Sequence, residues 1–306
     1  MPNDTVLVTG GTGTIGKAFV ALLASDARAP RVRVASRDPR SKGAALVRAL
    51  NPDTVSPVAF DVDNPDQMRA ALEGVTKLFV IAPFVPDLAG WHEKLARAAA
   101  AAKSIQLVVK SSVTGARAPT HEPPPGAVPL GHWRGEEAFR AMLPTVAIRP
   151  NIFMQHFLTV PGLYRPREDR FYLPTGDARV SWLDARDIAA AAAALVLASP
   201  TARAPYEGKA YELSGPGAIT ASEIAEVLSL VARRAVHHVD GAEAFVARCA
   251  ELRVPDGAKH FYGEAAGGWF ATVEDDLLVQ LTGRRATPFA EFAIDHAAHF
   301  GDGAGD

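Results

Sequence analysis

Short β-branched runs alternate with longer alanine- and leucine-rich stretches through the first half of the chain, and this alternation limits the fold more than any other feature. The runs predict strands, and the stretches between them predict helices. Strands that carry Val, Ile and Leu on both faces are typical of a parallel sheet covered by helices on both sides. We therefore expect an α/β fold with a doubly wound, Rossmann-type parallel sheet. The expected strands are 5–9, 32–36, 55–60, 77–82 and 105–111, and the expected helices are 14–25, 39–50, 65–73 and 87–102.

The second half of the chain is less regular, and it follows a stretch that interrupts the alternation. Five prolines at 118–129 exclude a helix or a central strand, so we expect a loop there. We predict an NAD(P)-binding Rossmann domain over 1–150, to which 179–214 returns, and a smaller, mixed substrate-binding part over 151–306. The later expected elements are helices at 131–142 and 184–197 and strands at 145–149, 179–183 and 210–214.

A glycine-rich turn joins the first expected strand to the first expected helix. Glycines 11, 13 and 16 match the spacing G-x-G-x-x-G, and glycines 10, 13 and 16 match G-x-x-G-x-x-G. Such glycines permit a tight turn, a close approach of the backbone to a pyrophosphate, and packing of the helix on the sheet. The helix N-terminus then presents N–H groups and partial positive charge to the phosphates. Because the turn lies within a βαβ unit, we predict dinucleotide binding rather than a merely structural turn.

The end of the second expected strand indicates which dinucleotide binds. An acid about twenty residues after the glycines would bind the ribose 2′-hydroxyl of NAD. Counting from Gly16, that distance reaches Ser36, which is followed by Arg37. A hydroxyl and a guanidinium suit the 2′-phosphate of NADP. Asp38 comes next, and a shift of one residue would make it the acid that NAD requires. We favour NADP(H) over NAD(H), with Arg37 at the phosphate.

Composition and charge exclude several classes of protein. The 306 residues include 32 Lys and Arg against 34 Asp and Glu, and this net charge of −2 provides no basic field for nucleic acid or an anionic membrane. The single cysteine, Cys249, excludes a disulfide framework and suits a reducing compartment. No apolar stretch reaches the roughly 20 residues of a membrane span. We expect a cytoplasmic monomer or homodimer that acts on a small molecule, with no metal, membrane or nucleic-acid partner.

The catalytic pair that standard short-chain dehydrogenase/reductases carry is absent. In that superfamily a Tyr-x-x-x-Lys lies on the helix after the fifth strand, where the Tyr is the acid and the Lys lowers its pKa. The corresponding helix at 131–142 has neither residue, and no lysine occurs between Ser111 and Gly208. His132 begins that helix, and an imidazole can donate a proton near neutral pH. The alternative for His132 is a capping or packing role.

Several motifs spread over most of the chain are specific in combination. They are the glycine-rich turn, Phe60-Asp61-Val62-Asp63, and the segments 78–83, 145–155 and 180–189. In this combination the sequence resembles the NmrA-like branch of the atypical short-chain dehydrogenase/reductases. The likeness is strongest to quinone oxidoreductases, triphenylmethane reductases and festuclavine dehydrogenases. Members of the branch commonly lack the Tyr/Lys pair, and some are nucleotide-sensing regulators.

The resemblance implies where the cofactor and the substrate bind. The candidates for catalysis are His132 and Ser111. Aromatic residues around Gly267-Gly268 suit a lid over a flat, apolar substrate, and their alternative is ordinary core packing. The expected cofactor-binding residues are Gly10, Thr12, Gly13, Thr14, Ile15, Gly16, Ser36, Arg37, Asp61, Val62, Ala82, Pro83, Phe84, Lys110, Ser111, Pro150, Asn151 and Phe153, and the expected substrate-binding residues are Phe84, Phe153, Phe157, Tyr262 and Trp269.

These observations favour one function and leave a second open. The first is an NAD(P)H-dependent reductase that transfers hydride to a small conjugated, quinone-like or iminium-type substrate without the usual Tyr/Lys pair. Such acceptors delocalise the charge or are already positive, so they accept hydride without a strong protein acid. The second is a non-catalytic regulatory protein that senses the redox state of NADP(H) and binds a protein partner.

Overall fold

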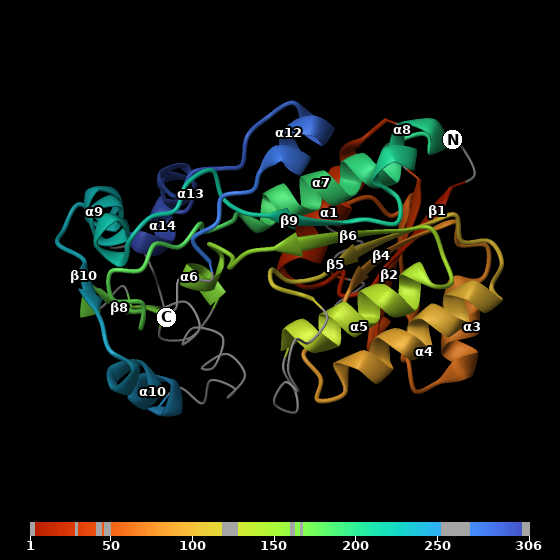
Figure 1. The fold of residues 1–306 in the computed structure, drawn as a ribbon, viewed down its shortest axis with the longest axis horizontal. Coiled ribbons are helices and arrows are strands. Elements are labelled where there is room, and N and C mark those ends of the chain that lie inside the picture. Colours follow the sequence, from red (N-terminus) through yellow and green to blue (C-terminus); the bar gives the residue numbers. More distant parts are fainter. Residues whose placement is uncertain are drawn as a thin grey trace. The chain divides into compact units, whose positions relative to one another are not determined.

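The chain forms two compact units, each assembled from segments that are far apart in the sequence (Figure 1). In the computed structural model the described residues are 4–27, 30–40, 45, 50–117, 128–159, 163–165, 168–251 and 270–301. The first unit comprises Met1–Pro150, Ile188–Glu212 and Gln280–Gly283, and the second comprises Asn151–Asp187, Leu213–Val279 and Arg284–Asp306.

A seven-stranded sheet in the order β3-β2-β1-β4-β5-β6-β9 forms the centre of the first unit. The neighbouring pairs from β3 to β6 are parallel. The strand order reverses at β1, and doubly wound folds bind ligands at such a point, beyond the carboxyl ends of the strands. The expected doubly wound parallel sheet is therefore confirmed. Its strands are β1 (Thr5–Val8), β2 (Arg31–Ser36), β3 (Val55–Ala59), β4 (Lys77–Ile81), β5 (Leu107–Ser111), β6 (Thr145–Pro150) and β9 (Ala210–Leu213).

Helices cover both faces of this sheet. α3, α4 and α5 lie on one face, and α1 and the main part of α7 lie on the other (Figure 1). α3 begins as its sequence predicts, because the Asn64 side chain accepts a hydrogen bond from the Gln67 N–H and Pro65 takes the first helical position. The expected helix at 39–50 and the loop at 118–129 lie largely outside the described residues. The helices of this unit are α1 (Thr14–Ser25), α3 (Pro65–Leu72), α4 (Leu88–Ala101), α5 (Val128–Arg140), α7 (Ala185–Leu197), α8 (Pro200–Arg203) and the 3₁₀ helix η3 (Ala204–Tyr206).

A hydrophobic core lies between the sheet and the face covered by α3, α4 and α5. Alternate residues of the strands, such as Leu78 and Val80, pack against helix residues such as Leu72, Leu95 and Phe139. Burial of side chains of this size stabilises the folded state by about 1.5–3 kcal/mol each. This packing fixes α5 against β5, and the helix and strand thereby hold their polar residues at set positions.

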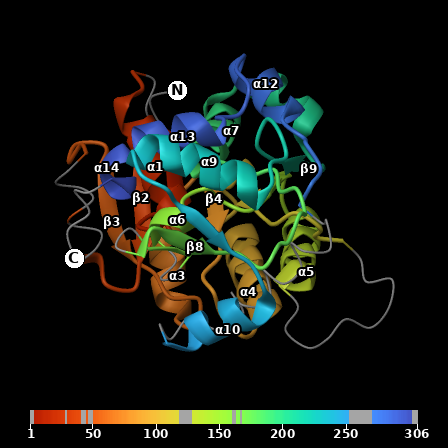
Figure 2. The same ribbon diagram turned by 90° about the vertical axis from the view of Figure 1, so that its left-hand side faces the viewer.

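The second unit is built around aromatic side chains. Phe157 packs against Phe171, Trp182 and Phe289, with ring centroids 5.0–5.7 Å apart. Its small sheet has the order β10-β8-β7, and α9 lies beside α13 (Figure 2). The elements of this unit are α6 (His156–Thr159), β7 (Tyr164–Arg165), β8 (Arg170–Tyr172), α9 (Ala221–Ala232), β10 (His237–Val239), α10 (Ala242–Glu251), most of α12 (Asp276–Thr282), α13 (Phe289–Asp295) and α14 (Ala297–Phe300).

One expected strand is absent from the described part of the chain. Residues 179–183 were expected to form a strand, and they form only isolated bridges, between Val180 and Ile219 and between Phe153 and Leu183. The reason is that successive backbone N–H groups donate to different segments. The Val180 N–H donates to Ile219 and the Ser181 N–H donates to Phe270. The segment crosses the core of the second unit and is therefore buried. Its apolar residues give the same sequence pattern as a buried strand.

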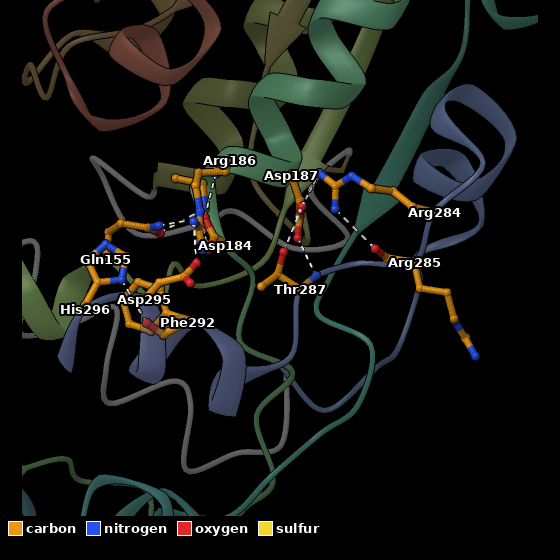
Figure 3. Close-up of polar contacts among 11 residues, drawn as sticks. Gln155, Asp184, Arg186, Asp187, Arg284, Arg285, Thr287, Phe292, Asp295 and His296 are labelled. Carbon is orange, nitrogen blue, oxygen red and sulfur yellow. Dashed lines mark hydrogen bonds and ion pairs between the residues drawn. The ribbon is translucent and has the colours of Figure 1, made fainter. Parts of the chain in front are cut away.

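Two buried aspartates at the start of α7 bind segments far away in the sequence (Figure 3). The Asp184 carboxylate accepts hydrogen bonds from the Arg186 N–H and from the Gln155 side chain, both at 2.7 Å. The Asp187 carboxylate accepts from the Thr287 N–H at 2.6 Å and pairs with Arg284 at 2.6 Å. Both carboxylates are 0 % exposed. Asp187 therefore anchors the chain before α13 and Asp184 binds Gln155 next to α6, so the two carboxylates do not form an open acidic site.

This anchoring predicts a difference between two aspartate substitutions. Asp187→Ala removes the acceptor of a buried backbone N–H, and it should lower the free energy of unfolding by about 2–3 kcal/mol. Asp295→Ala removes only an exposed ion pair with Arg186 and should cost at most about 1 kcal/mol. Denaturant unfolding followed by circular dichroism measures both. Equal losses for the two variants would show that the buried contact does not anchor the segment.

Candidate functional site

The glycine-rich turn has a geometry that only glycine permits at two positions. Gly10 has a φ of +62°, in the left-handed region. A Cβ at Gly16 would overlap the Gly10 carbonyl oxygen and lie 2.5 Å from the Gly11 Cα. The first turn of α1 therefore lies directly against the backbone of the loop. A Gly13 N–H to Gly10 carbonyl hydrogen bond of 2.9 Å closes the turn.

The start of α1 is suited to bind an anion. The first N–H groups of a helix have no partner within the helix, and together they carry partial positive charge. Gly13 precedes the helix and has no side chain to cap it, and the first turn holds no acidic residue. Gly13 and Thr14 are exposed, so this end of the helix is accessible. A pyrophosphate fits here, because small residues leave room and the N–H groups are available.

A hydroxyl, a base and an acid follow one another at the end of β2. The Ser36 hydroxyl accepts a hydrogen bond from the Asp38 N–H at 3.2 Å, and the Asp38 carboxylate accepts from the Arg40 N–H at 3.1 Å. Arg37 lies between these two residues and is exposed. The Asp38 carboxylate thus takes part in a backbone hydrogen bond, while the Arg37 side chain is exposed to solvent at the carboxyl end of the strand.

The carboxyl ends of the neighbouring strands bring further expected residues to the same edge. The Thr9 hydroxyl bonds both the N–H and the carbonyl of Ile81, at 2.9 and 3.0 Å, and fixes the ends of β1 and β4 together. Phe84 follows β4 with 72 % of its surface exposed, which is unusual for a side chain of this size. The other expected residues at this edge are Asp61 and Ala82, which are half-buried, Val62, which is buried, and Pro83, which is exposed.

A buried polar cluster lies between β5, β6 and α5. The Nζ atom of Lys110 lies 3.0 Å from the Nδ1 atom of His132. One helical turn further on, the Glu136 carboxylate accepts a hydrogen bond of 2.5 Å from the Ser112 hydroxyl. Arg149 holds the same carboxylate with two hydrogen bonds, of 2.7 and 3.0 Å. Lys110 and Glu136 are both 0 % exposed, so their charges interact without solvent between them.

Burial alters the proton affinities in this cluster. Burial lowers the pKa of Lys110, the Glu136 charge raises it and the Arg149 charge lowers it, and together they bring it to about 7. Burial and the Lys110 charge hold the pKa of His132 well below its ordinary value of 6.5. Burial likewise lowers the pKa of His92, whose ring lies 5.6 Å from that of His132, to about 2. Both imidazoles are therefore neutral at physiological pH.

Other expected site residues have different surroundings. Ser111 ends β5 and is buried, and strand alternation places its side chain on the sheet face opposite Lys110. Pro150 ends β6 and is buried.

The Asn151 amide donates to Ser181 and to the Phe270 carbonyl inside the second unit. Phe153 is half-buried against His156, and Phe157 lies in the aromatic core. Tyr262 and Trp269 lie outside the described residues. The binding roles of all these residues stay predictions.

The partnership between Lys110 and His132 was not predicted from the sequence. Lys110 was expected to bind the cofactor, and His132 was considered by itself. A lysine inside the apolar run 105–111, and an arginine inside the run 145–149, were the available signals. A charged residue on a buried strand requires a buried partner. The sequence does not show which helix supplies that partner.

Comparison with known proteins identifies the family. The model of the NmrA-like family matches residues 2–259. The chain is 35 % identical over 304 residues to an NAD(P)H azoreductase of Xenophilus azovorans, with 97 % of this chain and 99 % of that protein covered. The chain belongs to the NmrA-like family. An NmrA-like member of the atypical short-chain dehydrogenase/reductases was expected, and this expectation is confirmed. The expectation that the protein is an NAD(P)H-dependent oxidoreductase is confirmed as well.

Solved structures support the fold of this NmrA-like chain. The triphenylmethane reductase of Citrobacter sp., in complex with NADP(H), matches with a TM-score of 0.77 and 22 % identity over 95 % of this chain and 99 % of that one. NmrA, a negative transcriptional regulator in complex with NADP, matches with a TM-score of 0.75 and 18 % identity over 96 % and 95 %. Among the described residues, no helix is long and apolar enough to cross a membrane.

Two glycines of the turn should differ in what they tolerate. Gly13→Val places its side chain at the exposed start of α1, where a Cβ meets only the Gly10 carbonyl oxygen, at 3.2 Å. We expect this variant to fold and to lose dinucleotide binding. Gly16→Ala forces α1 away from the turn and should cost about 1–3 kcal/mol of stability.

Thermal unfolding and fluorescence titration with NADPH separate the two effects. Gly217→Ala is the control, because a Cβ there meets nothing within 4 Å. A folded Gly13→Val variant that binds NADPH as the parent does would contradict the assignment of the turn to the phosphates.

Proposed function

We propose that this protein is an NADPH-dependent reductase that transfers hydride to a small, conjugated or cationic acceptor. The observation that carries the proposal is the open, uncapped start of α1 against the glycine turn, which suits a dinucleotide pyrophosphate. The nicotinamide of the bound cofactor would supply the hydride. The protein would contribute binding, orientation and control of protons.

Arg37 supports NADPH over NADH as the cofactor. Its guanidinium is exposed at the end of β2, where the adenosine ribose of a dinucleotide lies in this kind of fold. The neighbouring Asp38 is exposed as well, and one oxygen of its carboxylate accepts the Arg40 N–H. A planar guanidinium can hold a phosphate through two parallel hydrogen bonds.

The acceptor is inferred from chemistry that the relatives share. The azoreductase and the triphenylmethane reductase are named for conjugated compounds that carry several aromatic rings. Such acceptors spread the incoming charge over several rings. Phe84 would offer an aromatic face to an acceptor of this kind, because it stands exposed beside the expected nicotinamide edge. Quinones and iminium compounds have the same electronic property and belong to the proposed class.

Steady-state assays test the proposal directly. Loss of NADPH absorbance should accompany reduction of an azo dye, a quinone or a triarylmethyl cation. A protein that binds NADPH tightly and reduces none of these acceptors would favour the alternative, a regulatory protein that senses the redox state of NADP(H); NmrA, a negative transcriptional regulator, shares the fold.

Cofactor preference provides a second test. We expect tighter binding of NADPH than of NADH, and Arg37→Ala should reduce the difference by about 1–3 kcal/mol, as for a hydrogen bond to a charged group. Arg31→Ala is the matched control, because Arg31 is also exposed but lies at the opposite end of β2. Isothermal titration of each variant with both dinucleotides measures the difference. Equal affinities in the parent protein would refute the role of Arg37.

A further inference from the structure

The lysine–histidine contact has no structural need that explains it. Lys110 is fully buried on a central strand, where an apolar residue would be stable without a partner. The acidic charge beside it, Glu136, is already held by two hydrogen bonds from Arg149 and one from Ser112. The lysine is therefore retained at an energetic cost in a cluster whose own ion pair is complete.

The contact defines the protonation states of both residues. Below about pH 7, where Lys110 is an ammonium, it can hydrogen bond to Nδ1 only by donating, because an ammonium has no acceptor. The neutral His132 ring must then carry its own proton on Nε2. His132 is half-buried, whereas Lys110 is enclosed, so the histidine is the more accessible member of the pair.

We propose that His132 is the proton donor of the reductase and that Lys110 positions and recharges it. This proposal rests on the function proposed above and replaces an acid-free reaction for acceptors that need a proton. The pair takes the place of the Tyr/Lys pair that the chain lacks.

The step balances for an azo acceptor. Hydride adds to one nitrogen, the N=N π bond breaks, and the electron pair moves to the other nitrogen. That nitrogen takes the proton from His132 Nε2. At the same time His132 Nδ1 takes a proton from the Lys110 ammonium, so that the ring stays neutral. The product is a hydrazine, and a bound dinucleotide that gives the hydride would be oxidised by two electrons. His132, the more accessible of the two residues, then takes a proton from water at Nε2 while Nδ1 returns its proton to Lys110, so that both residues regain their starting protonation.

The charges around the pair make this exchange possible near neutral pH. On α5, Glu136 favours the lysine proton, while Arg149 on β6 opposes it. Glu212 on β9 accepts a hydrogen bond from Arg149, and His92 on α4 lies beside the His132 ring. Burial lowers the pKa of Lys110 to about 7, so the pair holds its extra proton below that pH and loses it above. Proton-dependent turnover should therefore fall as the pH rises through about 7.

Two acceptors that differ in their need for a proton provide the test. Reduction of an azo dye requires a proton, whereas a triarylmethyl cation becomes neutral on taking hydride alone. His132→Asn keeps an acceptor for Lys110, but its amide cannot release one proton while it takes another from the lysine, as the imidazole ring does. It should lower kcat for the azo dye by at least about 100-fold, the lower limit of typical general acid catalysis. The rate with the cationic dye should stay within about tenfold. His237→Asn, an exposed histidine of β10, is the control and should change neither rate.

A second variant tests the lysine with a measurement that needs no turnover. Lys110→Met removes the charge and keeps the shape of the side chain. NMR titration should then show the His132 pKa moving up towards 6.5, and the fall of azo reduction near pH 7 should disappear.

The outcomes separate the two proposals. Equal losses with both dyes in His132→Asn, or an unchanged His132 titration in Lys110→Met, would overturn the proton relay and leave the reductase standing. A parent protein that binds NADPH and reduces neither dye would overturn the proposed function, and the relay with it.

Discussion

The contact between Gly16 and the backbone of Gly10 is the constraint on which the first unit depends. Because no side chain separates them, α1 begins directly at the end of β1 and points its free N–H groups towards the carboxyl edge of the sheet. The Thr9 hydroxyl fixes the ends of β1 and β4 at the same edge. The expected phosphate position and the exposed side chains of Arg37 and Phe84 all lie at this edge. A wider turn would move α1 away from it and separate the anion site from these residues.

The buried charges of β5, β6 and α5 follow a different principle. A carboxylate that is 0 % exposed is tolerated because Arg149 and Ser112 satisfy it with three hydrogen bonds. Lys110 lies in the same cluster, and its desolvation brings its pKa close to physiological pH. Perturbed pKa values of this kind concentrate at functional sites, because catalytic groups must exchange protons at working pH. In the proposed reductase the same cluster would hold α5 in place and also supply the proton.

Much of this fold could be predicted from local sequence. The strands of the first unit carry continuous apolar runs, and the start of α3 follows from Asn64-Pro65 alone. Contacts between distant residues could not be predicted in this way. Asp187 binds Thr287, one hundred residues further on, and Lys110 meets His132 only because α5 has a particular rotation against β5. The segment 179–183 looked like a strand, since burial in a loop and burial in a sheet leave the same apolar pattern. The glycine spacing predicted a tight turn, and the packing of Gly16 on Gly10 gives the physical reason for it.

The proposed function requires that hydride pass directly from the nicotinamide to the acceptor, and transfer of an isotope label measures this step. NADPH deuterated at carbon 4 of the nicotinamide, on one face or the other, is mixed with the protein and a triarylmethyl cation. The product holds the transferred atom on carbon, where it does not exchange with water. We expect deuterium in the product from NADPH labelled on one face only, and a slower rate of reduction with the NADPH labelled on that face. A product without deuterium from either face would contradict it.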